Sequence, residues 1–353
     1  MGSRKVWVDV LTPKQVLFFK PVIDQLASEG FEILATSRMY REVVPLAKRV
    51  GLDLCYVGER GDKDAAGQLE AATRRQAEII PLVRRFSPQI AVSVASAVCA
   101  RVAFGLGVRH IAVNDSPHSE VAGRLSLPMS YRVLCPWVIP FHAWSQYGIK
   151  RNQVITYHAL DPAMWLKRNA YGGPVPRLDS KKKTITIRVQ ESDAPYLAGK
   201  NRNWTVIVLE KVAREFQEHN LVALCRYGYQ VEEMKRAFGS TYIIPNDIVD
   251  GRGLLSATDL FIGMGGTMNA EAALLGVPTL SAFQGSLYTD EYLMREGLLK
   301  KVGSPDLLVG RAHACLKPGF KDRFMKKAKR VLDSMEDPMY PISGLIRRTV
   351  GQG

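Results

Sequence analysis

Short apolar runs alternate with longer amphipathic segments along the first part of the chain. Residues 6–10 form a run rich in β-branched and aromatic side chains, and Thr12-Pro13 then supplies an N-cap and a first-turn proline. Apolar residues recur after this start with a helical period until Gly30. The pattern repeats, and it predicts further strands at 32–36, 52–57, 90–94 and 110–113 and further helices at 42–50, 65–86 and 98–105.

A second series of alternating elements begins after residue 183. It predicts strands at 184–187, 221–224, 242–244, 260–262 and 279–281, and helices at 204–218, 231–238, 253–257, 267–275, 289–296, 320–335 and 343–350. Strands that alternate with helices in this way are typical of parallel, doubly wound sheets, whose ligands bind beyond the carboxyl ends of the strands.

We therefore predict an α/β fold of two Rossmann-like, doubly wound domains that face a cleft. The first domain is expected at 1–170, and a linker rich in glycine, proline and lysine follows at 171–183. The second domain is expected at 184–335. The C-terminal helix within 336–353 is expected to pack back on the first domain.

Composition places the chain among globular proteins and excludes collagen-like, disordered and disulfide-framework classes. Its 353 residues, 46% of them hydrophobic, are enough for two cores. The five cysteines are odd in number and none forms a C-x-x-C pair, so neither a disulfide framework nor a zinc site is indicated. The N-terminal residues show no apolar segment of the signal type. We expect a cytoplasmic protein.

Positive charge is where the composition departs from the average, since 48 Lys and Arg against 34 Asp and Glu give a net +14. Between residues 121 and 190, eleven basic residues stand against two acidic ones. Trp137, Phe141 and Trp144 lie in the same stretch. This combination suits a lipid-phosphate acceptor or the inner face of an anionic membrane, with the protein bound peripherally. Core packing under a solvated surface is the alternative, and nucleic acid is disfavoured because no RNA-binding motif is present.

The segment 262–279 carries the most specific chemistry. Gly263, Gly265 and Gly266 follow an expected strand, and a helix begins at Thr267. Glycines let the backbone approach an anion, and the helix start offers free N–H groups and the positive end of a dipole. Glu271 lies one turn into the helix, where its carboxylate can accept hydrogen bonds from paired ribose hydroxyls. The pattern predicts a diphosphate site, with a tight turn and a surface glutamate as the alternative.

The spacing of Gly265, Glu271, Gly276 and Pro278 resembles the donor-nucleotide signature of GT-B glycosyltransferases that use UDP-sugars. It also resembles that of the related non-hydrolysing UDP-GlcNAc 2-epimerases. In those families the glutamate of the motif holds the ribose, which implies that role for Glu271. Over nearly its whole length the chain further resembles a largely archaeal family of uncharacterised GT-B-like proteins, but only the segment 263–278 is specific.

The epimerase pattern is met only in part. His118-Ser119-Glu120 matches the His-x-Glu pair that follows the fifth strand in those enzymes, and Arg188 matches one residue of a His-Arg pair. The fourth strand, however, ends without an acid, and no Glu occurs between 121 and 190. Epimerisation must remove a C–H next to the anomeric carbon and eliminate UDP, which needs acid–base groups that are mostly missing. An epimerase-like enzyme is therefore the second interpretation.

Inverting glycosyl transfer needs fewer catalytic groups than epimerisation. It needs one base near the acceptor hydroxyl, and positive charge or helix dipoles to stabilise the departing UDP. Asp115, His118 and Glu120 follow the fifth strand and are the candidate catalytic residues, although a polar turn would also place such residues there.

Four further residues are candidate donor contacts. Lys14 stands at a proline-led helix start and Arg188 at a strand end, where each could meet a phosphate. Gln284 and Asp290 follow the donor motif at positions where such transferases commonly contact the sugar.

We therefore predict a glycosyltransferase that moves a sugar from a nucleotide donor, expected to be UDP, to a phosphorylated or lipid-linked acceptor. The domain at 1–170 would then be the acceptor side, and the domain at 184–335 would bind the nucleotide-sugar. The D-x-D sequence at 62–64 precedes an expected helix and is predicted to cap it, so we expect no metal and no cofactor beyond the nucleotide-sugar itself. A non-catalytic protein that binds nucleotide-sugars or polyanions is the third interpretation.

Overall fold

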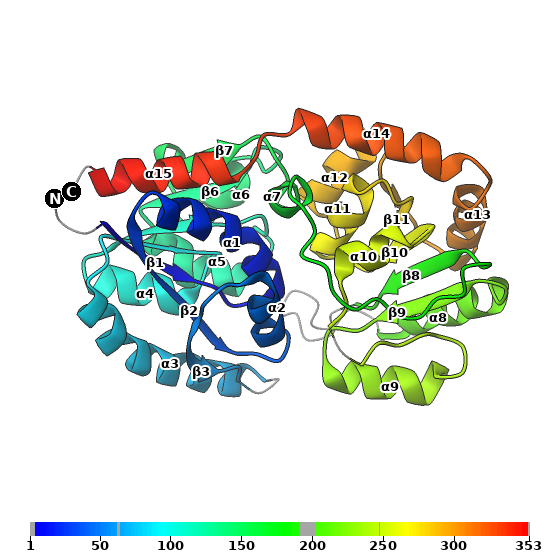
Figure 1. Cartoon of the computed structure of the whole chain (residues 1–353), viewed down its shortest axis with the longest axis horizontal. Helices are drawn as coiled ribbons and strands as arrows, with labels where there is room; N and C mark the ends of the chain where they lie inside the picture. Colours follow the sequence, from blue (N-terminus) through cyan, green and yellow to red (C-terminus); the bar gives the residue numbers. More distant parts are fainter. Residues whose placement is uncertain (1–3, 62–63, 191–201, 247, 352–353) are drawn as a thin grey trace. The chain divides into compact units, whose positions relative to one another are not determined.

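The computed structural model describes residues 4–61, 64–190, 202–246 and 248–351, and the chain divides into two compact units (Figure 1). Unit 1 comprises Met1–Trp165 and Glu336–Gly353, and unit 2 comprises Leu166–Met335. Each unit holds one sheet in which all paired strands run parallel, with helices between the strands. The predicted α/β fold with two parallel sheets is confirmed.

Unit 1 contains a seven-stranded sheet of order β3-β2-β1-β4-β5-β6-β7. The chain moves outward from β1 to β3 and then crosses back to β4, so the sheet has its topological switch point between β1 and β4. Ligands of doubly wound sheets bind outside the carboxyl ends of the strands near such a point. The strands are β1 (Arg4–Asp9), β2 (Phe31–Met39), β3 (Cys55–Glu59), β4 (Ile90–Ser93), β5 (Arg109–Val113), β6 (Arg132–Pro136) and β7 (Val154–Tyr157).

Helices pack on both faces of this sheet. One face is covered by α3 and α4, whose apolar side chains pack with Trp7 of β1 and Ala91 of β4. In a second set of helices, α1 packs against α2, α15 and β2, and α15 also packs against β4. The helices of unit 1 are α1 (Pro13–Ser28), α2 (Val43–Val50), α3 (Ala65–Phe86), α4 (Ala97–Gly105), α5 (Glu120–Ser126), α6 (His142–Ser145), α7 (Ala163–Leu166, which reaches into unit 2) and α15 (Met339–Gly351).

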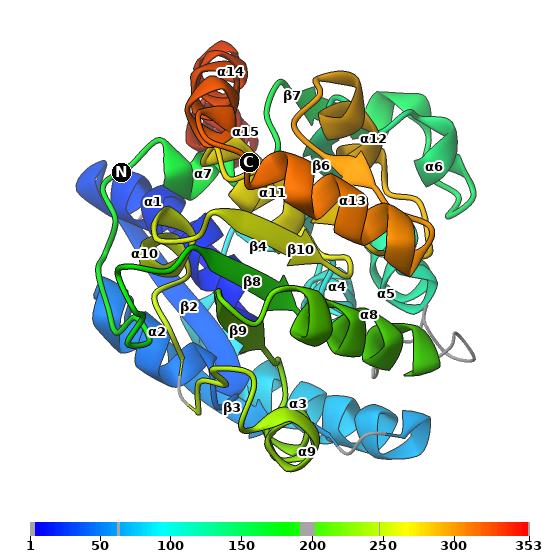
Figure 2. The ribbon, with the colours of Figure 1, turned by 90° about the vertical axis from the view of Figure 1, so that its right-hand side faces the viewer.

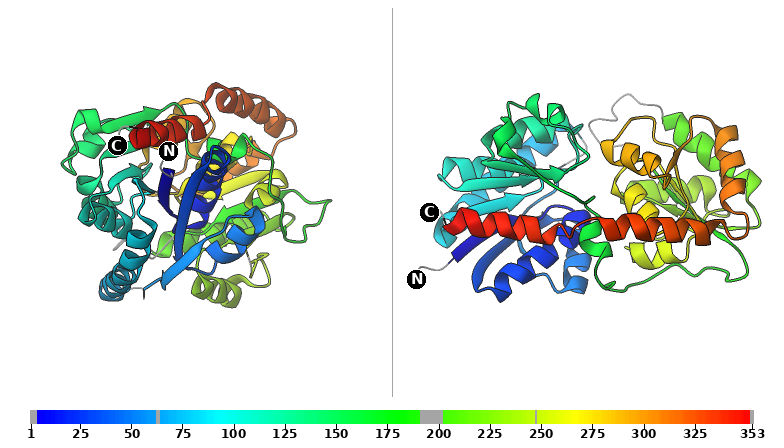
Figure 3. Two further views of the ribbon diagram at one scale, coloured as in Figure 1. Left: turned by 60° about the vertical axis from the view of Figure 1, so that its left-hand side comes forward. Right: turned by 90° about the horizontal axis from the view of Figure 1, so that it is seen from above.

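The helix α15 joins unit 1 from the far end of the sequence. It lies along α1 (Figure 3), and Arg347 Nη1 is 2.6 Å from Glu29 Oε1. Glu336, just before α15, accepts a hydrogen bond from the His158 N–H and donates its own N–H to the His158 carbonyl at 3.0 Å. These contacts fasten the returning chain to the end of β7.

Unit 2 contains a five-stranded sheet of order β12-β11-β10-β8-β9. Ile185, Ile187 and Ile262 face α8 and α13, which lie side by side (Figure 2), whereas Phe261 faces the opposite side with α10 and α11. The strands are β8 (Thr184–Arg188), β9 (Asn220–Leu224), β10 (Leu260–Gly263), β11 (Thr279–Ser281) and β12 (Lys300–Lys301). The helices are α8 (Arg202–Glu215), α9 (Gly228–Phe238), α10 (Gly251–Ser256), α11 (Thr267–Leu274), α12 (Tyr288–Arg295), α13 (Pro305–Cys315) and α14 (Phe320–Ser334).

The segment expected to be a linker, 171–183, bonds to unit 2. The Asp250 N–H donates to the Pro174 carbonyl at 2.7 Å, and the Asn220 side chain bonds to the backbone of Asp179 in both directions. Leu178 packs against Val222 and its neighbours. These contacts hold an irregular segment against the unit although it forms no strand or helix.

Several elements differ from those expected. The strands β6 and β7 were not predicted, because prolines interrupt the sequence between them and no long amphipathic helix separates them. The strand expected at 242–244 is wrong, since only Ile243 makes an isolated bridge, to Val222 of β9. The helix α13 was also missed; it is capped by the Ser304 hydroxyl and begins with Pro305.

A buried histidine links three elements of unit 1. Ser93 Oγ lies 2.9 Å from His110 Nε2, and Ser130 Oγ lies 2.9 Å from His110 Nδ1. His110 is 1% exposed. Burial lowers the pKa of His110 from 6.5 to about 4, so the folded protein keeps this imidazole neutral through the mildly acidic range.

This shift predicts an acid-sensitive contribution to stability. The unfolded state takes up a proton at His110 below pH 6.5 and the folded state only near 4, so the free energy of unfolding should fall by up to about 3 kcal/mol across that window as pH decreases. In His110→Gln this slope should be shallower, measured by urea unfolding between pH 7 and pH 4. The exposed His142 is the matched control, and equal slopes in His110→Gln and His142→Gln would contradict the assignment.

Candidate functional site

A glycine-rich turn, residues 263–266, joins β10 to α11 at the carboxyl edge of the unit 2 sheet. Gly265 has φ 100° and Gly266 has φ 88°, a region that L side chains rarely adopt. Gly266 stands at the N-cap of α11 and supplies no side-chain hydrogen bond. The first N–H groups of α11 therefore have no side-chain cap from that position and are suited to an anion. We call residues 263–266 the glycine loop.

Packing explains other glycines of the motif. A Cβ at Gly263 would lie 1.6 Å from Asn269 Oδ1, and one at Gly265 would lie 2.9 Å from the Phe283 ring. Gly276 has φ 83°, and a Cβ there would lie 2.8 Å from the Met325 Cα on α14. Gly276 is thus required by the close approach of α14, whereas Gly266 has open space around it.

Arg188 and Glu271 flank the glycine loop. Arg188 is the last residue of β8 and pairs in register with Gly263 of β10, and its Nη1 donates to the Cys225 carbonyl at 3.0 Å. Glu271 is partly exposed on α11, on the side away from the buried Asn269 and Ala270. Two predicted donor contacts, one cationic and one acidic, therefore lie on elements that adjoin the loop.

The two predicted sugar contacts differ in their surroundings. Gln284 is exposed, whereas Asp290 is 6% exposed and lies beneath the loop. Asn269 Nδ2 donates to Asp290 Oδ2 at 3.0 Å, and Ser281 Oγ donates to the same oxygen at 3.3 Å. Burial raises the pKa of Asp290 to about 6 although these hydrogen bonds oppose the shift. Asp290 thus ties α12 to α11 and β11.

A buried cluster of opposite charges lies at the carboxyl edge of the unit 1 sheet. Lys14 Nζ is 2.5 Å from Asp115 Oδ2 and 2.7 Å from Asp161 Oδ2. The Tyr157 hydroxyl donates to Asp161 Oδ1 at 2.5 Å, and the Ser116 hydroxyl donates to Asp115 Oδ1 at 2.8 Å. We call Lys14, Asp115 and Asp161 the lysine–carboxylate cluster.

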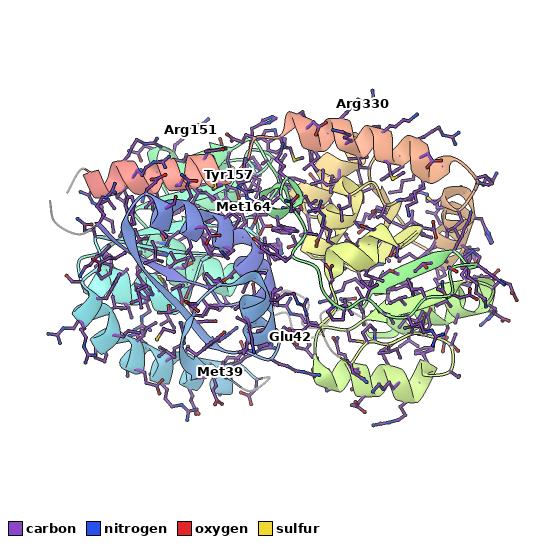
Figure 4. The ribbon with its side chains drawn as sticks, in the orientation of Figure 1. Met39, Glu42, Arg151, Tyr157, Met164 and Arg330 are labelled. Carbon is purple, nitrogen blue, oxygen red and sulfur yellow. The ribbon has the colours of Figure 1, made fainter. Side chains whose placement is uncertain are left out.

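The parallel sheet explains why these residues meet. Lys14 lies in the first turn of α1, just after β1, while Asp115 follows β5 and Asp161 follows β7, the strand that ends at Tyr157 (labelled in Figure 4). Parallel strands all end at one edge of the sheet, so groups up to 147 residues apart come within contact distance. Residues 13 and 14 turn toward β5 because α1 starts at the switch point.

The cluster separates the pKa values of its two acids. Burial alone would raise the pKa of Asp115, but the charge and hydrogen bond of Lys14 outweigh it and the pKa is lowered. Burial and the neighbouring Asp115 charge raise the pKa of Asp161 to about 6. The two carboxylates outweigh desolvation at Lys14 and raise the pKa of its ammonium group. One acid is thus held ionised and the other is close to accepting a proton, a division typical of acid–base sites.

The other two candidate bases lie at different distances from this cluster. His118 is partly buried, and the charges of Asp115 and Lys14 both act on it; burial lowers its pKa and so favours the neutral imidazole. Glu120 is 66% exposed and pairs with Arg124 one turn along α5, at 2.7 Å. The structure therefore brings Lys14, Asp115 and His118 together and leaves Glu120 on the surface.

The sequence analysis missed Asp161 and Tyr157. Both lie at the end of β7, and without that strand no pattern placed them at the same edge as Asp115. The signal was present in the charge count, because Asp161 is one of only two acids between residues 121 and 190. A single buried acid among many basic residues is a candidate for a specific ion pair.

A second buried network centres on Asp9, the last residue of β1. Asp9 Oδ1 accepts from Arg75 Nη2 at 2.6 Å and from the Thr36 hydroxyl at 2.8 Å. Asp9 Oδ2 accepts from the Ser96 hydroxyl at 2.8 Å and from Arg75 Nη1 at 3.2 Å. Asp9 is fully buried, so this network joins β1, β2, α3 and the start of α4 rather than facing a ligand.

The basic stretch 121–190 does not form one aromatic and cationic surface. The unit boundary divides it, with four of its basic residues in unit 1 and seven in unit 2. Trp144 is fully buried and Trp137 stacks on His158 with ring centroids 4.2 Å apart. The membrane-surface interpretation is therefore not supported, since part of its apolar set is core. Within the described part of the chain, no helix is long and apolar enough to cross a membrane.

The D-x-D sequence falls partly outside the described residues, which exclude 62 and 63. Asp64 caps α3, because its Oδ1 accepts a hydrogen bond from the Gly67 N–H at 2.6 Å. Among the residues that the structure describes, no three His, Cys, Asp or Glu side chains gather as metal ligands.

Comparison with known proteins assigns the family. Residues 4–340 match the family described as "Protein of unknown function (DUF354)". The chain belongs to that family. A curated relative, uncharacterised protein MJ0665 of Methanocaldococcus jannaschii, is 27% identical over 304 residues, which cover 84% of this chain and 87% of the relative.

Solved structures show where the fold of this DUF354 member recurs. The UDP-GlcNAc 2-epimerase of Neisseria meningitidis bound to UDP-GlcNAc has a TM-score of 0.74 and 14% identity, covering 99% of this chain and all of that one. The glycotransferase of kitacinnamycin has a TM-score of 0.65 and 14% identity at the same coverage. The two families that the donor motif resembles therefore share this fold.

The lysine–carboxylate cluster predicts a pH-dependent cost of removing its cation. Lys14→Met leaves two buried carboxylates without a counter-charge, which should lower the free energy of unfolding by about 3–5 kcal/mol. The loss should be larger at pH 8 than at pH 5, because protonation of the uncompensated acids relieves it. Lys48→Met, at an exposed position on α2, should change stability by only about 0.5 kcal/mol. A pH-independent loss in Lys14→Met would count against the cluster.

Proposed function

We propose that this protein is a glycosyltransferase that takes a sugar from a UDP-sugar bound by unit 2. The observation that carries the proposal is the glycine loop, with uncapped helix N–H groups at α11, Arg188 on the adjacent strand end and Glu271 one turn along the helix. This set matches a nucleoside diphosphate: backbone N–H groups and a guanidinium for the phosphates, and a carboxylate for the ribose hydroxyls. The Neisseria epimerase, of the same fold, is bound to UDP-GlcNAc, which supports a nucleotide-sugar ligand.

Asp115 of unit 1 is the proposed base. It is kept ionised by Lys14 and one of its oxygens accepts from Ser116, so it can take the proton of an acceptor hydroxyl as that oxygen attacks the anomeric carbon. The bond between the anomeric carbon and the UDP oxygen breaks, and the glycine loop and Arg188 stabilise the charge that develops on UDP. Lys14 is occupied by two carboxylates, so its role becomes that of holding Asp115 ionised rather than of binding phosphate. We assign to His118, on which the charge of Asp115 acts, the role of orienting the acceptor.

The acceptor is proposed to carry a phosphate, in keeping with the excess of 48 basic over 34 acidic residues. Metal is not required in this scheme, because the helix start and the guanidinium supply the positive charge for the departing UDP.

A UDP-sugar 2-epimerase is the second candidate, and Asp161 favours it. Epimerisation eliminates UDP from the sugar and adds it back, which needs two proton-transfer groups. The sequence by itself showed too few such groups. The structure adds a second acid beside Asp115, with its pKa raised to about 6. Burial of Asp161, at 2% exposed, argues against direct contact with a sugar and keeps this candidate second.

Glu271→Ala tests the donor site. If its carboxylate holds the ribose, the substitution should weaken UDP binding by about 1–3 kcal/mol, measured by isothermal titration. Glu233→Ala, at an exposed position on α9 of the same unit, should leave the affinity unchanged. Equal UDP affinity in both variants would remove Glu271 from the site, and no UDP binding in the unmodified protein would overturn the proposed function.

Asp115→Asn tests the chemistry. With water as the acceptor, release of UDP from a UDP-sugar should slow by about 10²–10⁴-fold in kcat, while UDP affinity is retained. The same reaction in D₂O distinguishes the two candidates, because epimerisation brings deuterium to C2 of the sugar and glycosyl transfer does not. An unchanged kcat in Asp115→Asn would exclude this residue as the base, and deuterium at C2 would establish the second candidate instead.

A further inference from the structure

A buried network of polar side chains lies beneath the glycine loop in unit 2. Asn269 is fully buried in the first turn of α11, and its Nδ2 donates to Asp290 Oδ2 at 3.0 Å and to Ser281 Oγ at 3.2 Å. Ser281 pairs in register with Gly263, and α12, which carries Asp290, packs against α11 (Figure 1). The network therefore connects the elements on either side of the loop.

The oxygen of the Asn269 side chain lies against the first residue of the loop. A Cβ at Gly263 would lie 1.6 Å from Asn269 Oδ1, so this oxygen occupies the space that a side chain would need. Oδ1 is buried and accepts no hydrogen bond from any residue that the structure describes. Its contact is with the Gly263 backbone, where a Cα–H is a weak donor.

Asp290 determines which way the Asn269 amide faces. A carboxylate only accepts hydrogen bonds, whereas an amide has a donor end and an acceptor end. The NH₂ group therefore faces Asp290, and the oxygen faces Gly263. A reversed amide would bring its oxygen against the carboxylate and leave its donors without an acceptor beside Gly263, which is unfavourable in a buried site.

The position of Asp290 suits support of the loop rather than contact with a ligand. Asp290 is 6% exposed, and its Oδ1 is buried without a donor among the described residues. Its other oxygen is committed to Asn269 and Ser281. Asp290 therefore acts on the loop through Asn269.

The loop needs such support because its own residues constrain it little. Gly265 and Gly266 both have positive φ, and no atom lies within 4 Å of where a Cβ on Gly266 would be. Glycine loses more conformational freedom on ordering than any other residue. A loop that is already ordered before the ligand arrives binds it more tightly.

We propose that Asn269 and Asp290 are positioning residues of the donor site: Asp290 orients the Asn269 side chain, and Asn269 fixes Gly263 and with it the glycine loop. The identity of the ligand as a nucleoside diphosphate rests on the proposed function. The fixing of the loop does not, so the two can be tested separately.

Hydrogen exchange in the unliganded protein tests the fixing of the loop. The Ala282 N–H donates to the Gly263 carbonyl at 2.8 Å, so its exchange rate reports displacement of Gly263. In Asn269→Ala this rate, measured by NMR, should rise on the order of tenfold. Asn220→Ala is the matched control, because Asn220 is also buried in unit 2 but lies at the start of β9 and bonds to Asp179.

UDP affinity, measured by isothermal titration, tests the effect on the ligand. Asn269→Ala and Asp290→Ala should each bind UDP on the order of tenfold more weakly, as is usual when a supporting partner of a ligand-binding group is removed. Asp290→Asn keeps an acceptor for Asn269 and places a donor where Oδ1 now has no partner, so it should retain the affinity. Asn220→Ala should also retain it, even where its free energy of unfolding falls as much as that of Asn269→Ala.

The outcomes separate this proposal from the proposed function. Equal Ala282 exchange in Asn269→Ala and Asn220→Ala overturns the positioning role of Asn269, and if Asn269→Ala does not fold, Asp290→Ala takes its place in this comparison. Asp290→Asn that loses as much UDP affinity as Asp290→Ala overturns the role of Asp290. If the unmodified protein does not bind UDP, the proposed function fails, while Ala282 exchange still decides whether the loop is fixed in this way.

Discussion

Every functional feature of this protein depends on one geometric constraint: the strands of a parallel sheet all end at the same edge. Helices cover both faces of each sheet, so strand interiors are mostly apolar and charged side chains lie at or near the strand ends. In unit 1 this edge collects Asp9, Arg38, Asp115 and Asp161, and in unit 2 it collects Arg188 and the glycine loop. Residues that are remote in sequence become neighbours because the sheet order, not the chain order, sets their spacing.

The charges at the unit 1 edge fall into two states that call for different interpretations. Asp9 and Arg75 form a buried ion pair, so their contact stabilises the fold. Lys14 is shared by two acids, which leaves Asp115 ionised and Asp161 near neutrality, and such a division suits proton transfer. The same residue types thus support structure or chemistry according to whether their hydrogen-bonding capacity is filled.

Sequence reasoning was most successful where local and global signals agree. The first five strands and the glycine-rich turn before α11 were predicted because each strand is followed by a clear turn and an amphipathic helix. It failed between residues 114 and 165, where the helices are too short to show a helical period and so do not mark the strands between them. Because β7 was not predicted, Tyr157 and Asp161 were not recognised as residues of the site. The basic stretch was interpreted as a surface, although Trp144 belongs to the core.

By itself the sequence determined the α/β class, the donor-like motif and the identity of Asp115 and Lys14 as polar groups at strand ends, because hydrophobic periodicity and turn chemistry are local properties. Only the tertiary structure decided that Lys14 is bound to two carboxylates, that Gly276 serves the packing of α14, and that Asn269 lies between Gly263 and Asp290. Those facts depend on which strand lies beside which. Strand order follows from long-range packing and the crossover after β3, and no local stretch of the chain encodes it.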